Sequence, residues 1–332
     1  MLPALAAVLM AFAGAGCASL PDLAARLIAG NRVHDLELFR FDPSTPLIDR
    51  VQPAPPHAPK YLQELDERPD YRSYRPNAAE RAKIQLAINE LPPRLARNLR
   101  ERGLGLYFID DFLTSGMTDF AVDRQSGELY SFMIFHRDSL RKDVDTLLTE
   151  REAPAFRDAG SGKVYVTTGT YVSAFTYLLL HEATHALDYS RRIGPYVEEH
   201  LEPLQSRQPR AEGLADLIDD VWAEYREPRA GSDFDRRDKI SFYGFRKGPH
   251  LRYRQAVPLY TGLINSPFVS LYGAQMMPED IAELVSMYWL TRKQPDAYII
   301  RVQQSGSLMV GFQPMLSKKI RRRVAGLKQA LQ

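Results

Sequence analysis

The residues best suited to chemistry in this chain lie in one short run, His181-Glu182-Ala183-Thr184-His185. Residues four apart lie on the same face of a helix, one turn above the other, so both imidazoles can reach one metal ion. The intervening glutamate is turned about 100° away, where its carboxylate can take a proton from a water molecule on the ion. The run therefore predicts a metal centre with His181 and His185 as ligands and Glu182 as general base.

The sequence around this run predicts a buried helix from 173 to about 189. Apolar residues precede and follow the run, and a helix that is apolar nearly all round belongs in a core. Unpaired polar groups cost free energy there, so the two histidines and the glutamate need partners. A metal ion would supply them; the alternative is a pair of core histidines bonded to backbone or carboxylate groups.

A catalytic zinc site also needs a third protein ligand. Asp188 and Arg191 stand where a metzincin would carry glycine and histidine, so we expect a glutamate from a later helix. Glu212 and Glu279 both qualify, and each has a second carboxylate four residues on that could bond a ligating histidine. Each also lies opposite the apolar stripe of its expected helix, as a solvated residue would. Periodicity leaves the choice open.

The segments 270–275 (SLYGAQ) and 278–283 (PEDIAE) resemble part of the catalytic domain of anthrax lethal factor and its relatives. These relatives include the Pro-Pro endopeptidases and a group of zinc-binding metallopeptidase lipoproteins. In that family a tyrosine precedes the ligand glutamate by seven residues, and an acidic residue follows it by four, after an alanine. The matching positions in this chain are Tyr272, Glu279, Ala282 and Glu283.

The resemblance implies that Glu279 is the third zinc ligand, that Tyr272 stabilises an oxyanion, and that Glu283 supports a ligand. It covers the helix with the two histidines and this later segment. Glu279 lies 94 residues after His185, about twice the family interval, which implies an insertion around 200–260. Because Glu212 falls inside that insertion, it remains the alternative ligand.

The same resemblance implies a zincin-like fold and a zinc endopeptidase of gluzincin type, with Zn²⁺ as cofactor and a peptide or protein as substrate. A strand at the edge of the sheet, at 128–136 or 163–168, is expected to pair with the extended substrate. Two alternatives stay open: a non-catalytic envelope lipoprotein that uses this fold as a binding module, and a zinc hydrolase of non-peptide bonds. The presence of Glu182 favours catalysis.

The N-terminal segment predicts delivery to the bacterial cell envelope. Residues 2–16 (LPALAAVLMAFAGAG) are uncharged and too short to span a bilayer, which is typical of a secretory signal. Gly14-Ala15-Gly16-Cys17 resembles a lipobox, which implies a lipid on Cys17, the only cysteine. Ala18 then implies the outer membrane by the usual Gram-negative sorting pattern. A plain cleaved signal with an incidental cysteine is the alternative.

The remaining pattern predicts a signal peptide at 1–16, a lipidated Cys17 with a Pro-rich tether at 17–75, and a metallopeptidase domain at 76–332. Six prolines between 43 and 59 disfavour helix and central strand in the tether, which is expected to be extended and to pack partly onto the domain surface. In the domain we expect a helix at 77–102 broken near 92–93, strands at 104–109, 118–122, 128–136 and 163–168, and later helices at about 211–225 and 278–291. This order predicts an α+β fold with a small mixed sheet packed on the central helix, followed by a mostly helical C-terminal part.

The charge of the chain is nearly balanced, with 43 basic and 41 acidic residues among 332. This balance argues against a nucleic-acid binder. A local basic cluster near the C-terminus is expected to be a solvated helix face, with a weak contact to anionic lipid head groups as the alternative. It consists of Lys318, Lys319, Arg321, Arg322 and Arg323.

Overall fold

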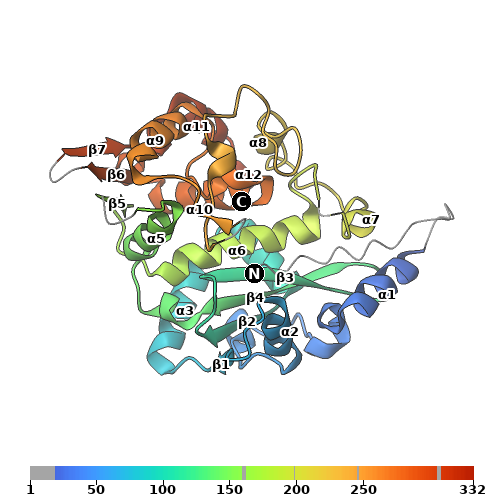
Figure 1. Cartoon of the computed structure of the whole chain (residues 1–332). Helices are drawn as coiled ribbons and strands as arrows, with labels where there is room; N and C mark the ends of the chain where they lie inside the picture. The colour runs from blue at the N-terminus through green and yellow to red at the C-terminus, as the bar shows by residue number, and fades with distance from the viewer. Residues whose placement is uncertain (1–18, 159–161, 198, 245–246, 305–307) are drawn as a thin grey trace.

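The computed structural model describes residues 19–158, 162–197, 199–244, 247–304 and 308–332. Helices and two small sheets form a mixed α+β structure (Figure 1), which confirms the class expected from the sequence. The expected signal segment 1–16 and Cys17 lie outside the described residues. Within the described ranges, no helix combines the length and the apolar character needed to cross a membrane.

The first sheet is mixed, as expected, with the order β1-β2-β4-β3. β2 and β4 run parallel, whereas β1 pairs with β2 and β3 pairs with β4 in antiparallel fashion. β1 and β3 are therefore the two edge strands, and the expectation that the strand at 128–136 lies at an edge is wrong. The strands are β1 (Arg72–Tyr74), β2 (Gly103–Asp110), β3 (Gly116–Val122) and β4 (Leu129–His136).

The second sheet has the order β5-β6-β7 and is antiparallel throughout. β5 is the strand expected at 163–168, and it lies at an edge, but of this sheet rather than the one with β3. The two C-terminal strands were not predicted, so the C-terminal part is less purely helical than expected. The strands are β5 (Gly162–Thr167), β6 (Ile299–Gln304) and β7 (Leu308–Phe312).

The central helix α6 (Ala174–Arg191) forms where the apolar run predicted it. Ser173 caps its N-terminus by accepting a hydrogen bond from the Thr176 amide at 3.2 Å. The ring of Phe175 packs against both Phe108 and Phe135 of the first sheet, at centroid distances of 5.5 and 4.9 Å. Helix α10 (Met277–Thr291) packs along the other side of α6 (Figure 1), so α6 lies between the sheet and α10.

Two successive helices confirm the predicted break near 92–93. They are α3 (Ala78–Asn89) and α4 (Pro93–Arg102). Asn77 and Glu80 form a reciprocal capping box at the start of α3, which accounts for its well-defined beginning. The other helices after α4 are α5 (Val144–Glu152), α7 (Glu202–Gln205), α8 (Asp216–Asp219), α9 (Ala256–Asn265), α11 (Lys318–Val324) and α12 (Leu327–Ala330).

The helix predicted over about 211–225 is wrong, because only α8 is helical there. Its apolar stripe is nevertheless buried, since Leu214, Ile218 and Val221 are each at most 4% exposed. Gly213 adopts a left-handed φ of 74°, and turns flank α8 on both sides. Turns therefore bring the same side chains into the core without a continuous helix.

The segment expected as an extended tether with partial packing onto the domain packs on the first sheet over its described part and contains regular elements. It contains α1 (Leu20–Gly30), α2 (His57–Leu65) and the sheet strand β1. The buried Arg50 side chain holds the Pro-rich stretch in place, because it donates hydrogen bonds to backbone carbonyls within that stretch and at the end of α4. Some of these hydrogen bonds join residues that are far apart in the chain, so the proline content of the segment could not predict them.

Arg323 differs from the solvated basic face expected at the C-terminus. It is 8% exposed, and its guanidinium donates to both carboxylate oxygens of Asp280, at 2.9 and 2.7 Å. It also donates to the carbonyls of Leu217 and Pro267. The other four members of the cluster are exposed, as expected.

Candidate metal centre

Helix α6 places His181, Glu182 and His185 in the interior of the molecule. His181 and Glu182 are each 4% exposed, and the His185 side chain is 15% exposed. The two imidazole centroids lie 4.9 Å apart, as the four-residue spacing requires. The helix therefore positions the two imidazoles on one face, facing α10.

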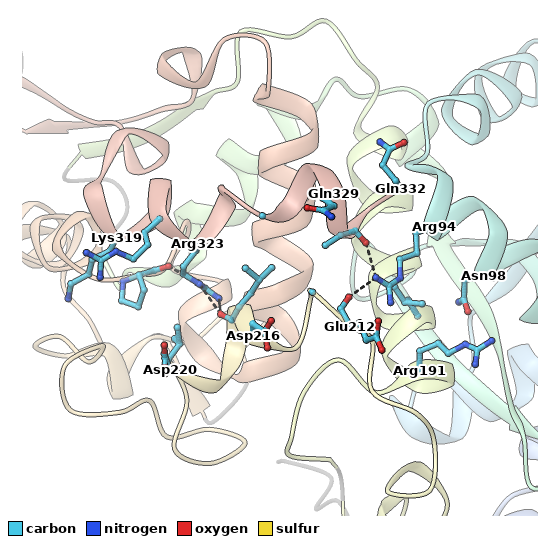
Figure 2. A pocket seen from close by; sticks show the side chains of 18 of the residues that line it. Arg94, Asn98, Arg191, Glu212, Asp216, Asp220, Lys319, Arg323, Gln329 and Gln332 are labelled. Atoms are coloured by element: carbon cyan, nitrogen blue, oxygen red, sulfur yellow. Dashed lines mark hydrogen bonds between the residues drawn. The ribbon is translucent and has the colours of Figure 1, made fainter.

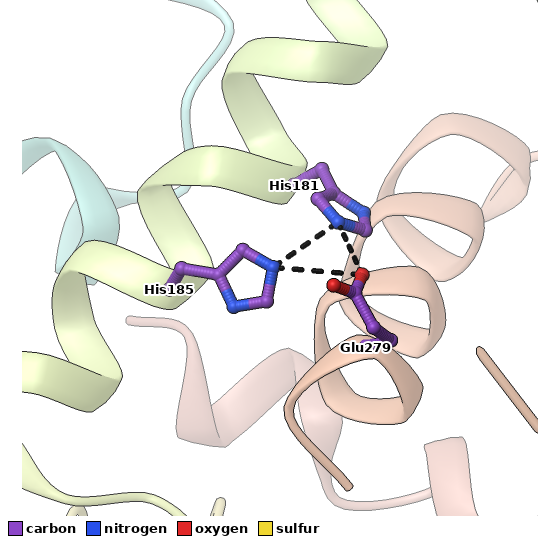
Figure 3. Close-up of side chains that lie close together, drawn as sticks. All are labelled: His181, His185 and Glu279. Carbon is purple, nitrogen blue, oxygen red and sulfur yellow. Dashed lines mark hydrogen bonds and ion pairs between the residues drawn. The ribbon is translucent and has the colours of Figure 1, made fainter. Parts of the chain in front are cut away.

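Glu279, in the first turn of α10, completes a compact group with the two histidines (Figure 3). Its Oε2 lies 3.0 Å from His181 Nε2 and 3.7 Å from His185 Nε2, and the two nitrogens are 3.2 Å apart. A tetrahedral ion with bonds of about 2.0–2.1 Å would hold its ligand atoms about 3.3 Å apart. These residues could thus hold a metal ion.

The charges of this group are coupled. Burial alone would raise the pKa of the Glu279 carboxyl, but its hydrogen bonds with His181 and His185 hold that pKa well below the ordinary value. Burial alone would lower the pKa of His181, but Glu279 and Glu283 raise it to about 10. In the absence of a cation, a proton on His181 therefore compensates the carboxylates.

Glu283, one turn further along α10, supports His181 from behind. Its Oε1 lies 3.2 Å from His181 Nδ1, and the carboxylate is fully buried. Arg151 of α5 binds both carboxylate oxygens, at 3.0 and 2.9 Å, and the hydroxyl groups of Ser270 and Tyr177 donate to them as well. The contact with His181 is therefore an ion pair at close range, and it places a negative charge beside the ring nitrogen that does not face Glu279.

Glu182 faces the beginning of the edge strand β3. Thr118 Oγ1 lies 2.7 Å from Glu182 Oε2 and 3.0 Å from the Glu182 carbonyl oxygen. A Cβ atom at Gly116 would come within 2.8 Å of Glu182 Oε1, so a larger residue there would require the carboxylate to shift. Burial raises the pKa of Glu182, while the two histidines and Thr118 lower it. A buried carboxylate with a raised pKa suits a general base.

Tyr272 lies beside the group, at the start of the short 3-10 helix Gly273–Gln275. Its ring centroid is 6.0 Å from that of His181, and the Arg151 guanidinium carbon lies 4.7 Å from its ring centre. Burial raises the pKa of its phenol well above the ordinary value, so the group remains protonated and able to donate. The structure thus brings together all five residues singled out from the sequence as catalytic or metal-binding.

Three contributors to the centre were not found from the sequence: Arg151, Thr118 and Tyr243. Tyr243 packs edge-on against Tyr272, with ring centroids 6.2 Å apart. Each of the three reaches the centre from an element far from α6 in sequence. No motif or periodicity marks these residues as partners of the two histidines.

Glu212, the alternative third ligand, lies in a different place (Figure 2). It lines a groove of about 1070 Å³, together with residues of α4, α11 and α12, and none of the three metal-group residues lines that groove. Its backbone carbonyl accepts a hydrogen bond from Arg94 Nη1 at 2.8 Å, and its side chain is not part of the group around His181. Among the described residues, the geometry favours Glu279.

Three comparisons with known proteins give no information about this centre. Protein-family models, curated proteins and solved structures provide no match to this chain.

Proposed function

We propose that this chain is a zinc endopeptidase of gluzincin type, with a zincin-like domain built on α6. The observation that carries the proposal is the convergence of His181, His185 and Glu279 with the carboxylate of Glu182 beside them. Imidazole and carboxylate ligands suit zinc, and three protein ligands leave a fourth position open. The sequence resemblance to the lethal factor group supports the same activity.

When bound, zinc would polarise a carbonyl group and lower the pKa of a coordinated water to about 7. Glu182 takes the proton of the attacking water and later returns it to the leaving amine. The Tyr272 phenol donates to the oxyanion that develops on the substrate carbonyl. The carboxylate of Glu283, paired with Arg151 and 3.2 Å from His181 Nδ1, would favour an orientation of His181 with Nε2 towards the ion.

An extended substrate would pair with β3, the edge strand beside α6. Thr118 of this strand donates a hydrogen bond to Glu182, so a peptide along the strand would pass the general base. Towards the other end of the strand, His34 Nδ1 lies 3.0 Å from the Phe120 carbonyl oxygen and Asp35 forms a bridge with Val122. Substrate pairing is therefore expected at the beginning of β3.

Glu182→Gln tests the mechanism, because the amide cannot accept the proton. The variant should retain wild-type zinc content while peptide turnover falls by at least about 100-fold. Zinc is measured by elemental analysis, and turnover on a fluorogenic peptide library. Glu64→Gln, at an exposed position on α2, is the matched control and should leave both unchanged.

Wild-type rates in Glu182→Gln would overturn the assigned base. A zinc-loaded wild type that cleaves no peptide would instead support the binding-module alternative. Activity on small amides or esters without a preference for extended peptides would support the non-peptide hydrolase.

The proposal includes attachment to the outer membrane through a lipid on Cys17, outside the described residues. Cys17→Ser should abolish incorporation of labelled palmitate in cells and move the protein from the membrane to the soluble envelope fraction. Unchanged labelling would show that Cys17 is not the attachment site.

A further inference from the structure

The backbone groups of β3 alternate between positions that face β4 and positions that face the free edge of the sheet. Just before the strand, the Ser115 carbonyl oxygen accepts a hydrogen bond from the His136 amide at 3.0 Å. Just after it, the Asp123 amide donates to the Glu128 carbonyl oxygen at 2.9 Å. Successive residues of an antiparallel pair point their N–H and C=O groups to opposite sides, so the odd-numbered residues face β4. The residues that face the free edge are Gly116, Thr118, Phe120 and Val122.

The second half of this free edge is occupied by the chain between α1 and α2. His34 Nδ1 donates to the Phe120 carbonyl oxygen at 3.0 Å, and the two rings stack at a centroid distance of 4.1 Å. Asp35 forms a parallel bridge with Val122, and Arg124 binds the Asp35 carboxylate at 2.6 Å. Asp35 is only 2% exposed, so this contact is an integral part of the fold. The free edge is therefore closed from Phe120 onwards.

Thr118 has edge groups that remain available. Among the residues that the structure describes, none outside the pairing of β3 with β4 bonds to its N–H or C=O. Two residues earlier, the Gly116 carbonyl oxygen accepts from Thr114 Oγ1 at 3.1 Å. The Thr118 side chain lies at the general base, with Oγ1 2.7 Å from Glu182 Oε2. One residue with both edge groups available thus lies beside this carboxylate.

A single available residue favours one direction of a bound peptide. In an antiparallel pair, one residue exchanges both hydrogen bonds with one partner residue, whereas in a parallel pair its two groups reach two different residues. A peptide that bonds to Thr118 alone is therefore expected to run antiparallel to β3. Its N-terminal part then points towards Phe120, where His34 occupies the edge.

We propose that His34 and Asp35 form an end wall that limits the substrate on its N-terminal side. This inference deepens the proposed function and rests on it. The substrate residue that pairs with Thr118 lies beside Glu182, and the next outward-facing position, at Phe120, is taken by His34. Only about two substrate residues therefore fit between the end wall and the cleaved bond. The substrate class is a peptide that is cleaved close to its free N-terminus.

Lengthening a peptide at either end tests the end wall. The core peptide is the best substrate of the fluorogenic library, shortened to about two residues before and about four after the cleaved bond, and it is lengthened with alanines, up to about six. We expect N-terminal lengthening to lower kcat/KM about tenfold, because the chain must leave β3 and give up hydrogen bonds with Thr118. C-terminal lengthening should keep kcat/KM within about twofold. Calorimetry on the zinc-loaded Glu182→Gln variant gives the same comparison as dissociation constants, without cleavage.

His34→Ala should move the end wall outwards. The Phe120 carbonyl oxygen becomes available, while the bridge between Asp35 and Val122 still closes the edge two residues further on. We therefore expect the N-terminal length at which kcat/KM falls to increase by about two residues. Arg32→Ala, at an exposed position in the same part of the chain, is the matched control and should keep the wild-type length limit. Circular dichroism and cleavage of the core peptide show that both variants are folded.

Equal kcat/KM for the core peptide and its N-terminally lengthened forms would overturn the inference, and so would a loss on C-terminal lengthening. Both results would leave cleavage of the core peptide, and with it the proposed function, intact. An unchanged length limit in a folded His34→Ala variant would also overturn it; if that variant does not fold, the wild-type comparison decides. A zinc-loaded wild type that cleaves no peptide would overturn the proposed function and this inference with it.

Discussion

Glu283 shows how one buried carboxylate organises the surroundings of the candidate metal centre. Burial alone would raise the pKa of Glu283, but the charges of Arg151 and His181 hold it well below the ordinary value. Its carboxylate is 0% exposed and Arg151 is 7% exposed, so neither charge has bulk water as a partner. Removing one partner of such a buried ion pair strongly lowers the free energy of unfolding, because the other charge then stays in the interior without a partner.

Glu283→Gln should therefore destabilise the zinc-free protein strongly. We expect a loss of about 3–5 kcal/mol in the free energy of unfolding, measured by urea denaturation. Glu150→Gln is the matched control, since Glu150 pairs with Lys142 where both side chains are substantially exposed, 53% and 36%. That pair should contribute less than about 1 kcal/mol. Comparable losses in the two variants would mean that Glu283 and Arg151 are not a strongly coupled pair.

The part of the site that could be predicted from residues alone is the part contained in one helix. His181, Glu182 and His185 follow from helical spacing, because four residues span one turn. The choice of Glu279 over Glu212 came from the family resemblance, since both glutamates lie opposite an apolar stripe in sequence. Tyr243 could not be found, because its place depends on a left-handed backbone and on packing against distant elements.

At the scale of elements, the first turns of α10 direct three carboxylates to three different partners. Glu279 faces the two histidines, and Glu283 faces Arg151. Asp280, fully buried between them, accepts from Arg323 of α11 and from the Trp222 indole N–H at 2.8 Å. Helix α10 therefore joins the metal-binding group to the C-terminal helices.

Arg323→Ala should uncouple α11 from α10 and leave Asp280 without its cation. We expect the free energy of unfolding to fall by about 3–5 kcal/mol. Arg321→Ala, two residues away on the exposed face of α11, should change it by less than about 0.5 kcal/mol. Chemical denaturation of both variants measures the difference. If Arg321→Ala were as harmful as Arg323→Ala, the general basic character of α11, and not this ion pair, would account for the effect.

Elements with strong local signals were predictable, and elements that depend on distant contacts were not. The helix expected from 77 begins in the structure at Ala78, after the Asn77 cap, and the apolar run predicted α6. Leu214, Ile218 and Val221 are buried, yet α8 spans only Asp216–Asp219. The Pro-rich segment folds against α4 through Arg50, whose acceptors lie up to 53 residues away in the chain. Helix and strand propensities depend on neighbouring residues, so they cannot predict hydrogen bonds between residues that far apart.

At the scale of the molecule, the candidate metal centre joins two parts of the chain that are distant in sequence. His181 and Glu279 are 98 residues apart, on helices that pack side by side (Figure 1). The first helix rests on the β1-β2-β4-β3 sheet, and the second connects to α11 through Asp280. An ion held by both helices would therefore add a cross-link between the sheet layer and the helical layer.

Zinc should consequently stabilise the folded protein as a whole. A ligand that binds only the folded state at about 100 times its dissociation constant contributes about 2.7 kcal/mol, so removal of zinc by EDTA should lower the unfolding temperature. Thermal unfolding followed by circular dichroism measures the shift. His185→Ala removes one ligand and should abolish it, whereas Glu182→Gln, which leaves all three ligands in place, should preserve it. A full zinc-dependent shift in His185→Ala would locate the stabilising ion outside this group, because the unchanged remainder of the protein would then be sufficient to bind it.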